Sequence, residues 1–442
     1  MGKTLIIGMG VSGQAAAKLL LGRGHSVIGV DSRYSELAQD PALAQLISQG
    51  LILENDKSSL FFGDIDLVIV SPGISLKHPL YIAAKGENKR ILSEVELGCL
   101  YLLDQKVIGV TGTNGKTTVT LLIEHILNYA GKTAIALGNV GVALSAEIER
   151  LDQDHIIVLE LSSYQLEMLS QKVIDVGILL NITPDHLDRY GTMEAYARAK
   201  LNIQKCIKPE GGVLLIEEKT ASQYATLLSP ETSYQLFGYQ DSNFYHTDLK
   251  NLFRNGQLLA ELPKAYQDKP SLHIENFLAA SAACYTLGVP YETAINSLSS
   301  FVPPRHRIEF VRKIRGVSYY DDSKGTNVEA VKRAVEMLPN HVILIAGGVD
   351  KGESYTYWVD GFKNKVKCIC AIGEAKGKIK ENLEGSISVL TFNDLKEAVH
   401  YASSIAKPND SILLSPGCAS YDMFRDYVHR GKEFQSIVNS LG

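Results

Sequence analysis

Lys106-Val-Ile-Gly-Val-Thr-Gly-Thr-Asn-Gly-Lys-Thr-Thr118 joins a short apolar run to a glycine-rich turn and then to a stretch with helical spacing. Glycines in such a turn leave backbone N–H groups open to a phosphate chain, while Lys116 would reach the β- and γ-phosphates and Thr117 would hold Mg²⁺. Val110 stands where the standard pattern has its first glycine, so this is a variant P-loop. The residues predicted to bind a nucleoside triphosphate here are Gly112, Thr113, Asn114, Gly115, Lys116, Thr117 and Thr118.

Apolar runs and helical stretches alternate on both sides of this motif. Runs typical of buried strands lie at 4–7, 27–30, 67–70, 155–159, 176–180, 341–346, 366–372 and 411–414. Strands separated by helical spacing indicate βαβ units and parallel sheets, so we expect an α/β protein. The polar stretch 230–270 predicts loops and edge strands, and helical spacing returns at 274–287.

The length of the chain, 442 residues, exceeds what one hydrophobic core usually serves, so it predicts two or three domains. Pro303-Pro304 resists both helix and central strand and marks one boundary. We expect a Rossmann-like N-terminal domain at 1–95, a P-loop domain with a mostly parallel sheet at 96–302, and a Rossmann-like C-terminal domain at 303–442.

The charge and cysteine content narrow the class of protein. Lys and Arg number 44 against 49 Asp and Glu, and a net charge of -5 argues against a general nucleic-acid binder. No apolar run is long enough to span a bilayer, and the N-terminus lacks the features of a signal peptide. The six scattered cysteines fit a cytoplasmic protein with free thiols better than a metal or disulfide framework.

A second glycine-rich turn lies near the N-terminus. Gly8-Met-Gly10-Val-Ser-Gly13 follows a predicted strand and opens a predicted helix, and Asp31 ends the next strand. This is the fingerprint of a site for a phosphorylated nucleotide. NAD(P), another nucleotide and a nucleotide-sugar all fit the geometry; Arg33 suits a phosphate or a uracil carbonyl, and suits a solvated surface charge equally well.

Three polar residues after the P-loop are candidates for metal chemistry. Glu160 ends the apolar run 155–159, where it could hold Mg²⁺ or cap a helix. His186 lies in a loop between Asp185 and Asp188; a lone His is more often structural, but these neighbours favour a functional role. Lys200 shares a predicted helix face with Met193, Tyr196 and Ile203. Such a lysine usually extends to solvent, whereas a buried one becomes a reactive amine that can add CO₂.

Three loops in the C-terminal third follow predicted strands, at 318–320, 341–346 and 411–414. They contain Asp321-Asp-Ser-Lys-Gly-Thr-Asn327, Gly347-Gly-Val-Asp-Lys-Gly352 and Ser415-Pro-Gly-Cys-Ala-Ser420. Ligands of open α/β sheets bind at the carboxyl ends of the strands, so the three loops together favour a phosphate or ribose site. Each alone would also suit an ordinary hydrophilic loop.

Taken together, these motifs resemble the Mur ligase family, the ATP-dependent amide-forming enzymes of peptidoglycan precursor synthesis. The resemblance spans essentially the whole chain. It rests on Thr111 to Thr118 with its unusual spacing, Ile7 to Gly13, Leu159 to Leu166, Asn181 to Tyr190 and Leu414 to Phe424. It implies ATP, UDP-N-acetylmuramoyl-L-alanine and D-glutamate as substrates, Mg²⁺, most simply as two ions, and a bacterial cytoplasmic location; we expect a monomer.

The resemblance assigns roles residue by residue. The implied catalytic residues are Lys116, Glu160, His186 and Lys200. The implied Mg²⁺ ligands are Thr117, Glu160, His186 and Lys200. Lys200 would bind the metal as a carbamate, so the resemblance reverses the expectation that this side chain extends to solvent. The triphosphate at the P-loop is that of ATP, which also contacts Asn276, Arg307, Asp322 and Lys324. The UDP substrate contacts Ser12, Asp31, Ser32, Arg33, Gly73, Asn139, Gln165 and His186, which replaces the NAD interpretation. D-glutamate contacts Thr326, Lys351, Ser420 and Tyr427.

The sequence differs from the family pattern at one position, and three alternative functions have to be compared with this one. His273 stands where the family commonly has the first Asn of a pair whose second matches Asn276, so the way adenine is held is open. A folyl-polyglutamate-type ligase would lack the separate N-terminal unit. A nucleotide-dependent dehydrogenase would leave the P-loop unexplained. A P-loop binding module would leave Lys200 and the C-terminal loops without a role.

Overall fold

The structure is a computed structural model, and it describes residues 2–57, 62–263, 273–339 and 341–442, with the side chain of residue 188 excepted. The described residues form two compact units. One comprises the described residues within Met1–Asn181, Ala197–Glu261 and Glu275–Ser299; the other comprises those within Ile182–Tyr196, Leu262–Ile274 and Ser300–Gly442. Three sheets, one within each predicted domain, confirm the predicted α/β class.

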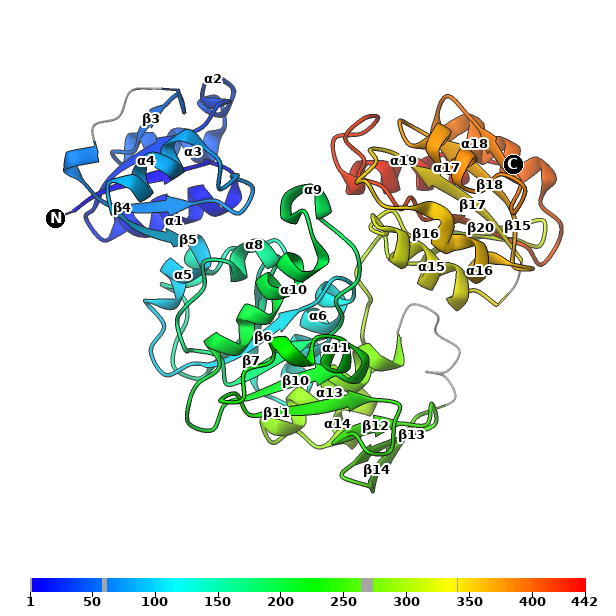
Figure 1. Ribbon diagram of the computed structural model, residues 1–442, viewed down its shortest axis with the longest axis horizontal. Coiled ribbons are helices and arrows are strands. Elements are labelled where there is room, and N and C mark those ends of the chain that lie inside the picture. The colour runs from blue at the N-terminus through cyan, green and yellow to red at the C-terminus, as the bar shows by residue number, and fades with distance from the viewer. Residues whose placement is uncertain (1, 58–61, 264–272, 340) are drawn as a thin grey trace. The chain divides into compact units, whose positions relative to one another are not determined.

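The N-terminal sheet has five parallel strands in the order β3-β2-β1-β4-β5 (Figure 1). This order places a switch point between β1 and β4, beside the glycine-rich turn that follows β1. The elements are β1 (Lys3–Ile7), α1 (Val11–Gly22), β2 (Ser26–Val30), α2 (Tyr34–Leu37), α3 (Pro41–Ser48), β3 (Ile52–Glu54), η1 (Phe62–Asp64), β4 (Ile65–Val70), α4 (Pro79–Gly86), β5 (Arg90–Ser93) and α5 (Glu94–Cys99).

The central sheet has the order β14-β13-β12-β11-β10-β9-β6-β8-β7, parallel except for the hairpin β13–β14 and its pairing with β12. Its strands are β6 (Lys106–Thr111), β7 (Thr133–Gly138), β8 (His155–Glu160), β9 (Val176–Leu179), β10 (Val213–Glu217), β11 (Tyr234–Gly238), β12 (Tyr245–Thr247), β13 (Asn251–Arg254) and β14 (Gln257–Glu261). The strand that leads into the P-loop, β6, is flanked by β8 and β9. Strands form within the predicted stretch 230–270 and β14 is an edge strand, but β11, β12 and β13 lie between other strands of the sheet. The part at 264–272 lies outside the described residues.

The helices of this region are α6 (Lys116–Tyr129), α7 (Leu144–Glu147), α8 (Ser163–Leu166), α9 (Leu187–Tyr190), α10 (Met193–Leu201), η2 (Asn202–Cys206), α11 (Glu218–Gln223), η3 (Ala225–Leu227), α13 (Ile274–Thr286) and α14 (Tyr291–Ser297). The single helix face predicted from Met193 to Ile203 is wrong at its end, because α10 stops at Leu201 and Ile203 lies in the 3₁₀ turn η2. Asn202 explains the change: its amide donates to the carbonyls of Leu166 and Leu169, which ties this turn to the chain after α8.

The C-terminal sheet has the order β15-β16-β20-β17-β18-β19, parallel except for β15. Alternate side chains of its strands feed two cores: Leu344 and Ala346 pack with α15, α16 and α17, and Ile343 and Ile345 pack with α18 and α19. The elements are β15 (Glu309–Ile314), β16 (Val317–Asp321), α15 (Val328–Met337), β17 (Val342–Gly347), η4 (Tyr355–Tyr357), α16 (Trp358–Phe362), β18 (Val366–Ile372), α17 (Lys376–Asn382), β19 (Val389–Thr391), α18 (Leu395–Ile405), β20 (Ser411–Leu414) and α19 (Tyr427–Ser440).

Candidate functional site

The P-loop forms the predicted strand–turn–helix junction between β6 and α6. Gly115 has φ 90°, a left-handed conformation that glycine adopts without strain, and α6 begins at the next residue. The Lys116 amine donates to the carbonyl oxygens of Gly112 at 2.8 Å and Thr113 at 2.9 Å, so it lies across its own loop. Thr117 is buried in the first turn of α6. A turn of this kind can bind a phosphate chain.

Asn181 braces the P-loop from the end of β9, a role that sequence reasoning missed. Its side-chain oxygen accepts from the Asn114 N–H at 2.8 Å, its amide donates to the Asn114 carbonyl at 3.0 Å, and its main-chain oxygen accepts from the Thr113 N–H at 2.8 Å. The signal available in the sequence was an Asn directly after the apolar run 176–180. Three hydrogen bonds from one residue hold the turn in shape before any ligand arrives.

Glu160 ends β8 with its carboxylate inside the protein. The side chain is 1% exposed; Oε1 accepts from the Asn139 amide at 2.7 Å, and Oε2 has no hydrogen-bond donor among the described residues. A buried carboxylate oxygen without a donor is costly unless a cation or another partner satisfies it. The residues therefore fit a metal ion at this position. Asn139, predicted to contact the UDP substrate, lies directly against this acid.

Lys200 is buried next to the P-loop, so the expectation that it extends to solvent is wrong. The side chain is 2% exposed, and its Nζ donates to the Gly112 carbonyl at 2.7 Å. Asn276 also lies at this loop, since a Cβ placed on Gly115 would come within 2.6 Å of the Asn276 oxygen. The structure thus brings together Lys116, Lys200 and Asn276, three residues that are far apart in sequence.

Gln165 has a structural role that the sequence did not reveal. Its side-chain oxygen accepts from the N–H of Ser162 at 2.9 Å, and the Ser162 hydroxyl accepts from the Gln165 N–H, which forms a capping box at the start of α8. The Gln165 side chain is buried at this position, a few residues beyond Glu160. Its predicted contact with the substrate stays a prediction.

The N-terminal turn is shaped by Asp31. One carboxylate oxygen accepts from the Met9 N–H at 2.9 Å and the other from the Arg33 N–H at 2.9 Å, so the turn after β1 and the loop after β2 are tied together. The other residues predicted to bind the UDP substrate in this domain are Ser12 at the start of α1 and the exposed Ser32, Arg33 and Gly73. Their location at the carboxyl ends of β1, β2 and β4 agrees with a ligand at the switch point.

The three C-terminal loops lie together, as the sequence predicts. The Gly417 N–H donates to the Gly325 carbonyl at 2.8 Å, and the Val349 N–H donates to the Ala419 carbonyl at 2.9 Å. Arg430 of α19, which sequence reasoning missed, is 1% exposed and donates to the Ser323 carbonyl at 2.8 Å. Burial lowers the pKa of the Arg430 guanidinium to about 10, and the group remains charged at neutral pH.

Asp322 and its neighbours form the part of these loops predicted to bind ATP. Burial raises the pKa of Asp322 to about 7, although a hydrogen bond from the Ser415 hydroxyl at 2.6 Å and the charge of Arg307 act in the opposite direction. The Lys324 amine lies 5.2 Å from the centre of the Tyr427 ring, a cation–π distance. Among the described residues, the Arg307 Nε–H has no acceptor although it is buried. The cluster can present positive charge and hydrogen-bond donors to an anion.

Lys351 and His186 lie in the same compact unit. The Lys351 amine donates to Asp185 Oδ1 at 3.1 Å, and the other carboxylate oxygen of Asp185 lies 3.7 Å from Nε2 of His186. His186 has φ 55°, a left-handed conformation unusual for a residue with a side chain. Asp185, which carried no predicted role, thus contacts both residues. Ser420 is buried in the loop after β20, and Thr326 lies between Asp322 and α15.

The predicted site residues are divided between the two units. Thr117, Glu160, Lys200, Asn139 and Gln165 belong to the first, with the N-terminal turn and Asn276. His186, Arg307, Asp322, Lys324, Thr326, Lys351, Ser420 and Tyr427 belong to the second.

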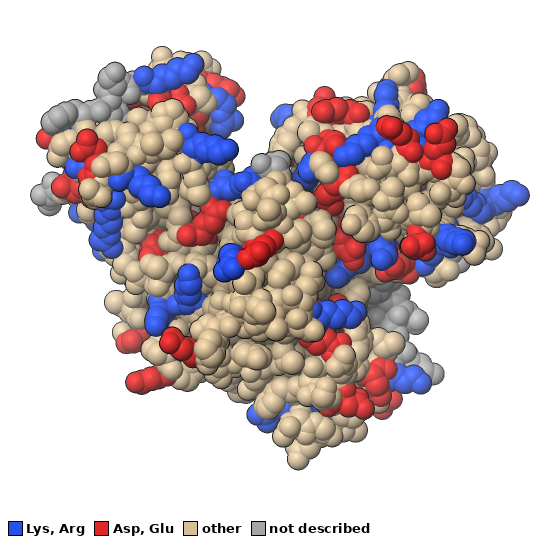
Figure 2. Space-filling view, viewed as in Figure 1, with Lys and Arg blue, Asp and Glu red and all other residues tan. Residues whose placement is uncertain are grey.

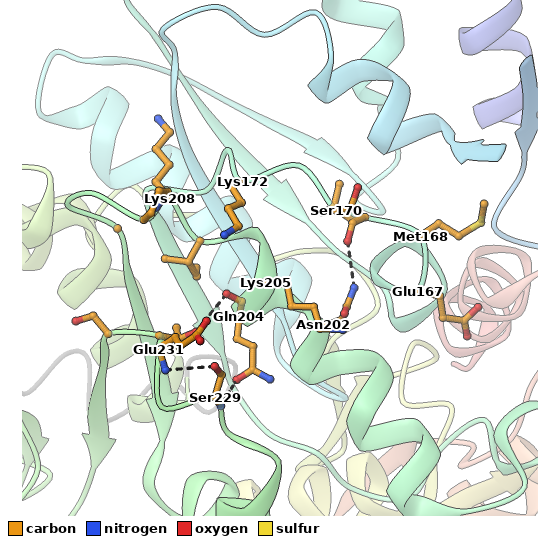
Figure 3. Close-up of a pocket in the computed structure, with 16 residues that line it drawn as sticks. Glu167, Met168, Ser170, Lys172, Asn202, Gln204, Lys205, Lys208, Ser229 and Glu231 are labelled. Carbon is orange, nitrogen blue, oxygen red and sulfur yellow. Dashed lines mark hydrogen bonds between the residues drawn. The ribbon is translucent and has the colours of Figure 1, made fainter. Parts of the chain in front are cut away.

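A separate cavity of about 840 Å³ lies elsewhere in the first unit (Figure 3). Its walls include Gly212 and Ser233, which immediately precede β10 and β11. These are the amino ends of the strands, whereas the P-loop follows the carboxyl end of β6, which is parallel to β9 and β10 in one sheet. Within the cavity Gln204 accepts from the Ser229 N–H at 2.7 Å. None of the predicted site residues lines it.

Comparison with known proteins agrees with this geometry. Family models match three successive parts of the chain: a MurD-like N-terminal domain of Mur ligases at 2–93, the Mur ligase middle domain at 110–284, and the glutamate ligase domain of Mur ligases at 306–418. The chain belongs to the Mur ligase family. The middle model begins at Val110 and so includes the variant P-loop and Glu160. The predicted family and its class of enzyme, ATP-dependent amide-bond-forming ligases, are confirmed.

Curated Mur ligases match the chain over its whole length. A UDP-N-acetylmuramoylalanine–D-glutamate ligase of Protochlamydia amoebophila is 49% identical over 440 residues, covering 99% of this chain and 98% of that protein. A ligase of the same name from Caldicellulosiruptor bescii is 35% identical, covering 99% and 97%.

Solved Mur ligases share the fold. The MurC ligase of Thermotoga maritima superposes with a TM-score of 0.62 at 18% identity, covering both chains completely. MurF of Acinetobacter baumannii gives a TM-score of 0.63 at 18% identity, covering 89% and 87%. At this identity the likeness concerns the fold alone.

The charge on the surface and the length and apolar character of the helices bear on what the protein can bind. Acidic and basic side chains are interspersed over the face shown in Figure 2. Across the described residues, no helix has the length and apolar character needed to cross a bilayer.

Proposed function

We propose that this Mur ligase joins D-glutamate to UDP-N-acetylmuramoyl-L-alanine at the expense of ATP, a step of peptidoglycan precursor synthesis. The observation that carries the proposal is the 49% identity, along the whole chain, with a relative named for that reaction. The geometry supports it independently, because a preformed P-loop and a buried acid suited to a metal lie in one unit.

The P-loop residues Gly112 to Thr118 bind the triphosphate through backbone N–H groups, and Lys116 exchanges the carbonyls of its own loop for phosphate oxygens. Asn276 lies near enough to Gly115 to contact the same nucleotide. Arg307, Asp322 and Lys324 supply further contacts to its phosphates and ribose.

The metal-binding groups are Thr117 and Glu160 for one Mg²⁺, and His186 with carbamylated Lys200 for a second. Most of these ligands offer oxygen atoms, which Mg²⁺ prefers. The Glu160 carboxylate oxygen that has no hydrogen-bond donor among the described residues supports a metal ion at this position. When bound, Mg²⁺ would neutralise charge on the phosphates of ATP. The Lys200 amine, inside the protein beside Gly112, lies where a carbamate would have a hydrogen-bond partner ready.

The UDP substrate binds at the N-terminal switch point through Ser12, Asp31, Ser32, Arg33 and Gly73. Its muramoyl part approaches Asn139, Gln165 and His186. The backbone N–H groups at the start of α1 favour a diphosphate. Both carboxylate oxygens of Asp31 accept hydrogen bonds from backbone N–H groups of the protein itself, so Asp31 holds the turn in shape.

D-glutamate binds in the C-terminal loops through Thr326, Lys351, Ser420 and Tyr427. Lys351 offers one fixed charge for a carboxylate, and the turn that carries it is anchored by the hydrogen bond from Val349 to Ala419. In the free protein this amine is paired with Asp185, so the substrate carboxylate takes the place of an internal one.

The chemistry follows from these positions. The carboxylate of UDP-N-acetylmuramoyl-L-alanine attacks the γ-phosphorus of ATP and yields an acyl phosphate and ADP. The neutral amine of D-glutamate then attacks the acyl carbon, and the tetrahedral intermediate expels phosphate and leaves an amide. Lys116 and the P-loop N–H groups stabilise charge on the transferred group, and the fixed loops orient the reactants.

The domain limits 1–95, 96–302 and 303–442 belong to this proposal as the UDP-binding, ATP-binding and amino-acid-binding parts. The monomeric state and the cytoplasmic location stay predictions from the sequence.

The test is phosphate release with UDP-N-acetylmuramoyl-L-alanine, ATP and Mg²⁺, comparing D-glutamate with L-glutamate and with other amino acids. We expect release only when the nucleotide-sugar and D-glutamate are both present, and loss of release in Lys116→Met. Equal release with L-alanine or a diamino acid would contradict the assigned acceptor. Folate-dependent release, or NAD(P) reduction without phosphate release, would favour the rival enzymes.

A further inference from the structure

Glu353 is a buried acid in the turn that carries Lys351, and no role has been assigned to it so far. The side chain is 8% exposed, and its Oε2 accepts from the Val328 N–H at 3.3 Å, at the start of α15. The other oxygen, Oε1, is buried and meets no hydrogen-bond donor among the described residues. A carboxylate oxygen left without a donor inside a protein can accept a proton or a donor from a ligand.

Three charged residues, from two segments of the chain, act on Glu353. Asp185, on the loop before α9, and Asp350, on the same turn, are acidic, and Lys351 is basic. Asp350 is already paired with Lys378 at 2.7 Å, and Asp185 with Lys351 at 3.1 Å. Burial, assisted by the charge of Asp185, raises the pKa of Glu353 to about 7, while the Val328 N–H and Lys351 act against this rise.

An amino acid arrives at this place as a zwitterion, with a carboxylate for Lys351 and an ammonium that cannot attack an acyl phosphate. We propose that Glu353 is the general base that takes one proton from the ammonium of the amino-acid substrate and so frees its lone pair for attack. The proton moves from nitrogen to a Glu353 oxygen, giving a neutral amine and a neutral carboxylic acid. The second proton leaves with the expelled phosphate. The inference rests on the proposed D-glutamate site at Lys351.

Asp185 is less suited to the same role. Its Oδ1 accepts from the His186 N–H at 2.9 Å and from Lys351, and its Oδ2 accepts from the Asn327 amide at 3.4 Å. These donors stabilise the ionised form and occupy both oxygens. Glu353 keeps one oxygen undonated, and a base with a pKa near the working pH transfers protons most efficiently.

A purely structural role for Glu353 would be to cap α15. Asn327 already fills that position, since its side chain accepts from the Ala330 N–H at 2.8 Å. Glu353→Gln keeps an acceptor oxygen for Val328 and removes only the ability to take a proton. The substitution therefore separates the two roles.

The experiment compares wild type, Glu353→Gln and the control Glu381→Gln, an exposed acid on α17 of the same unit. At neutral pH we expect Glu353→Gln to lose about 10²- to 10⁴-fold in D-glutamate-dependent turnover. The loss should shrink as the pH rises, because solution then supplies more neutral amine. Rapid-quench formation of ADP in a single turnover without D-glutamate should be unchanged, since it precedes the proton transfer.

Three results would overturn the assignment: turnover equal to wild type, a loss that is the same at every pH, or a matching loss of single-turnover ADP formation. A lower melting temperature with unchanged turnover would indicate the capping role alone. Absence of D-glutamate-dependent phosphate release in the wild type would instead contradict the proposed function, so the two failures are distinguishable.

Discussion

Lys200 is the residue whose chemistry depends most on its surroundings. Its amine lies inside the protein and donates to the Gly112 carbonyl, which belongs to the P-loop. A carbamate of this amine would keep one N–H, which is enough to preserve that hydrogen bond, and would add two oxygens that share one negative charge and can bind a metal ion. An unmodified ammonium would bring a positive charge to the place where Mg²⁺ is proposed to bind.

We expect Lys200→Ala to lose more than the roughly 10- to 100-fold in activity that removal of a residue supporting a metal ligand typically costs, with partial recovery on adding a short carboxylic acid. The control is Lys205→Ala, an exposed lysine on the following turn η2, which should keep wild-type activity. Wild-type protein in ¹³C-bicarbonate should show a carbamate NMR signal that the Lys200 variant lacks. Equal signals from the two proteins would remove the carbamate from the site.

Single residues also show where sequence reasoning ended. Lys116, Glu160 and Lys351 could be selected as candidates because each carries a charge after an apolar run, and their roles stay predictions. Asn181 and Glu353 could not, because their roles come from hydrogen bonds made or left unmade in the folded chain. A sequence shows which groups are present, but it does not show which buried oxygen lacks a donor.

Elements were predicted best where spacing alone determines them. Short apolar runs predicted the strands β1, β2, β4, β6, β8, β9, β17, β18 and β20, because a strand buried on both faces is apolar throughout. The partly exposed edge strands β3, β15 and β19 were not predicted. The end of α10 was missed, since it depends on the contact of Asn202 with the chain after α8, more than thirty residues away in sequence. A long-range hydrogen bond leaves no periodic signal.

Gly10 and Gly13, at the start of α1, differ in the space around them. A Cβ on Gly13 would lie 2.0 Å from the Gly8 carbonyl oxygen, so helix and turn touch backbone to backbone. A Cβ on Gly10 would meet nothing within 4 Å, and the φ of Gly10, -71°, is one that any residue can adopt. Gly13 therefore serves the fold, and the open space beside Gly10 suits a diphosphate.

We expect Gly10→Val to leave the melting temperature unchanged and to raise KM for the UDP substrate roughly tenfold or more, because the side chain would enter the path of the phosphates. Gly13→Ala should instead destabilise the fold by about 1–3 kcal/mol, the usual cost of overpacking. Calorimetry measures the stability of each variant, and KM values for all three substrates show which binding site each substitution affects. A rise in KM for ATP alone with Gly10→Val would contradict the assignment of this turn to UDP.

At the scale of the molecule, the C-terminal sheet has the structure of an independent domain. Its two cores draw their buried residues from 317–438 alone, with β17 and β20 contributing to both faces. Asp321 of β16 accepts from Gln435 of α19 at 2.7 Å and contacts His306 at 2.7 Å, which closes the first strands onto the last helix.

We therefore expect the fragment 303–442 to fold alone and to unfold cooperatively on heating. The matched control is 303–426, which lacks α19 and with it Phe434, Ile437 and Val438. Burial of three such side chains contributes roughly 5–9 kcal/mol, which approaches the whole stability of an ordinary domain, about 5–15 kcal/mol. The shorter fragment should show no cooperative transition by circular dichroism and no slowly exchanging amides. If 303–442 also lacked both, its sheet would depend on the segment Ile182–Tyr196 of the same compact unit, and the predicted domain limit at 303 would be wrong.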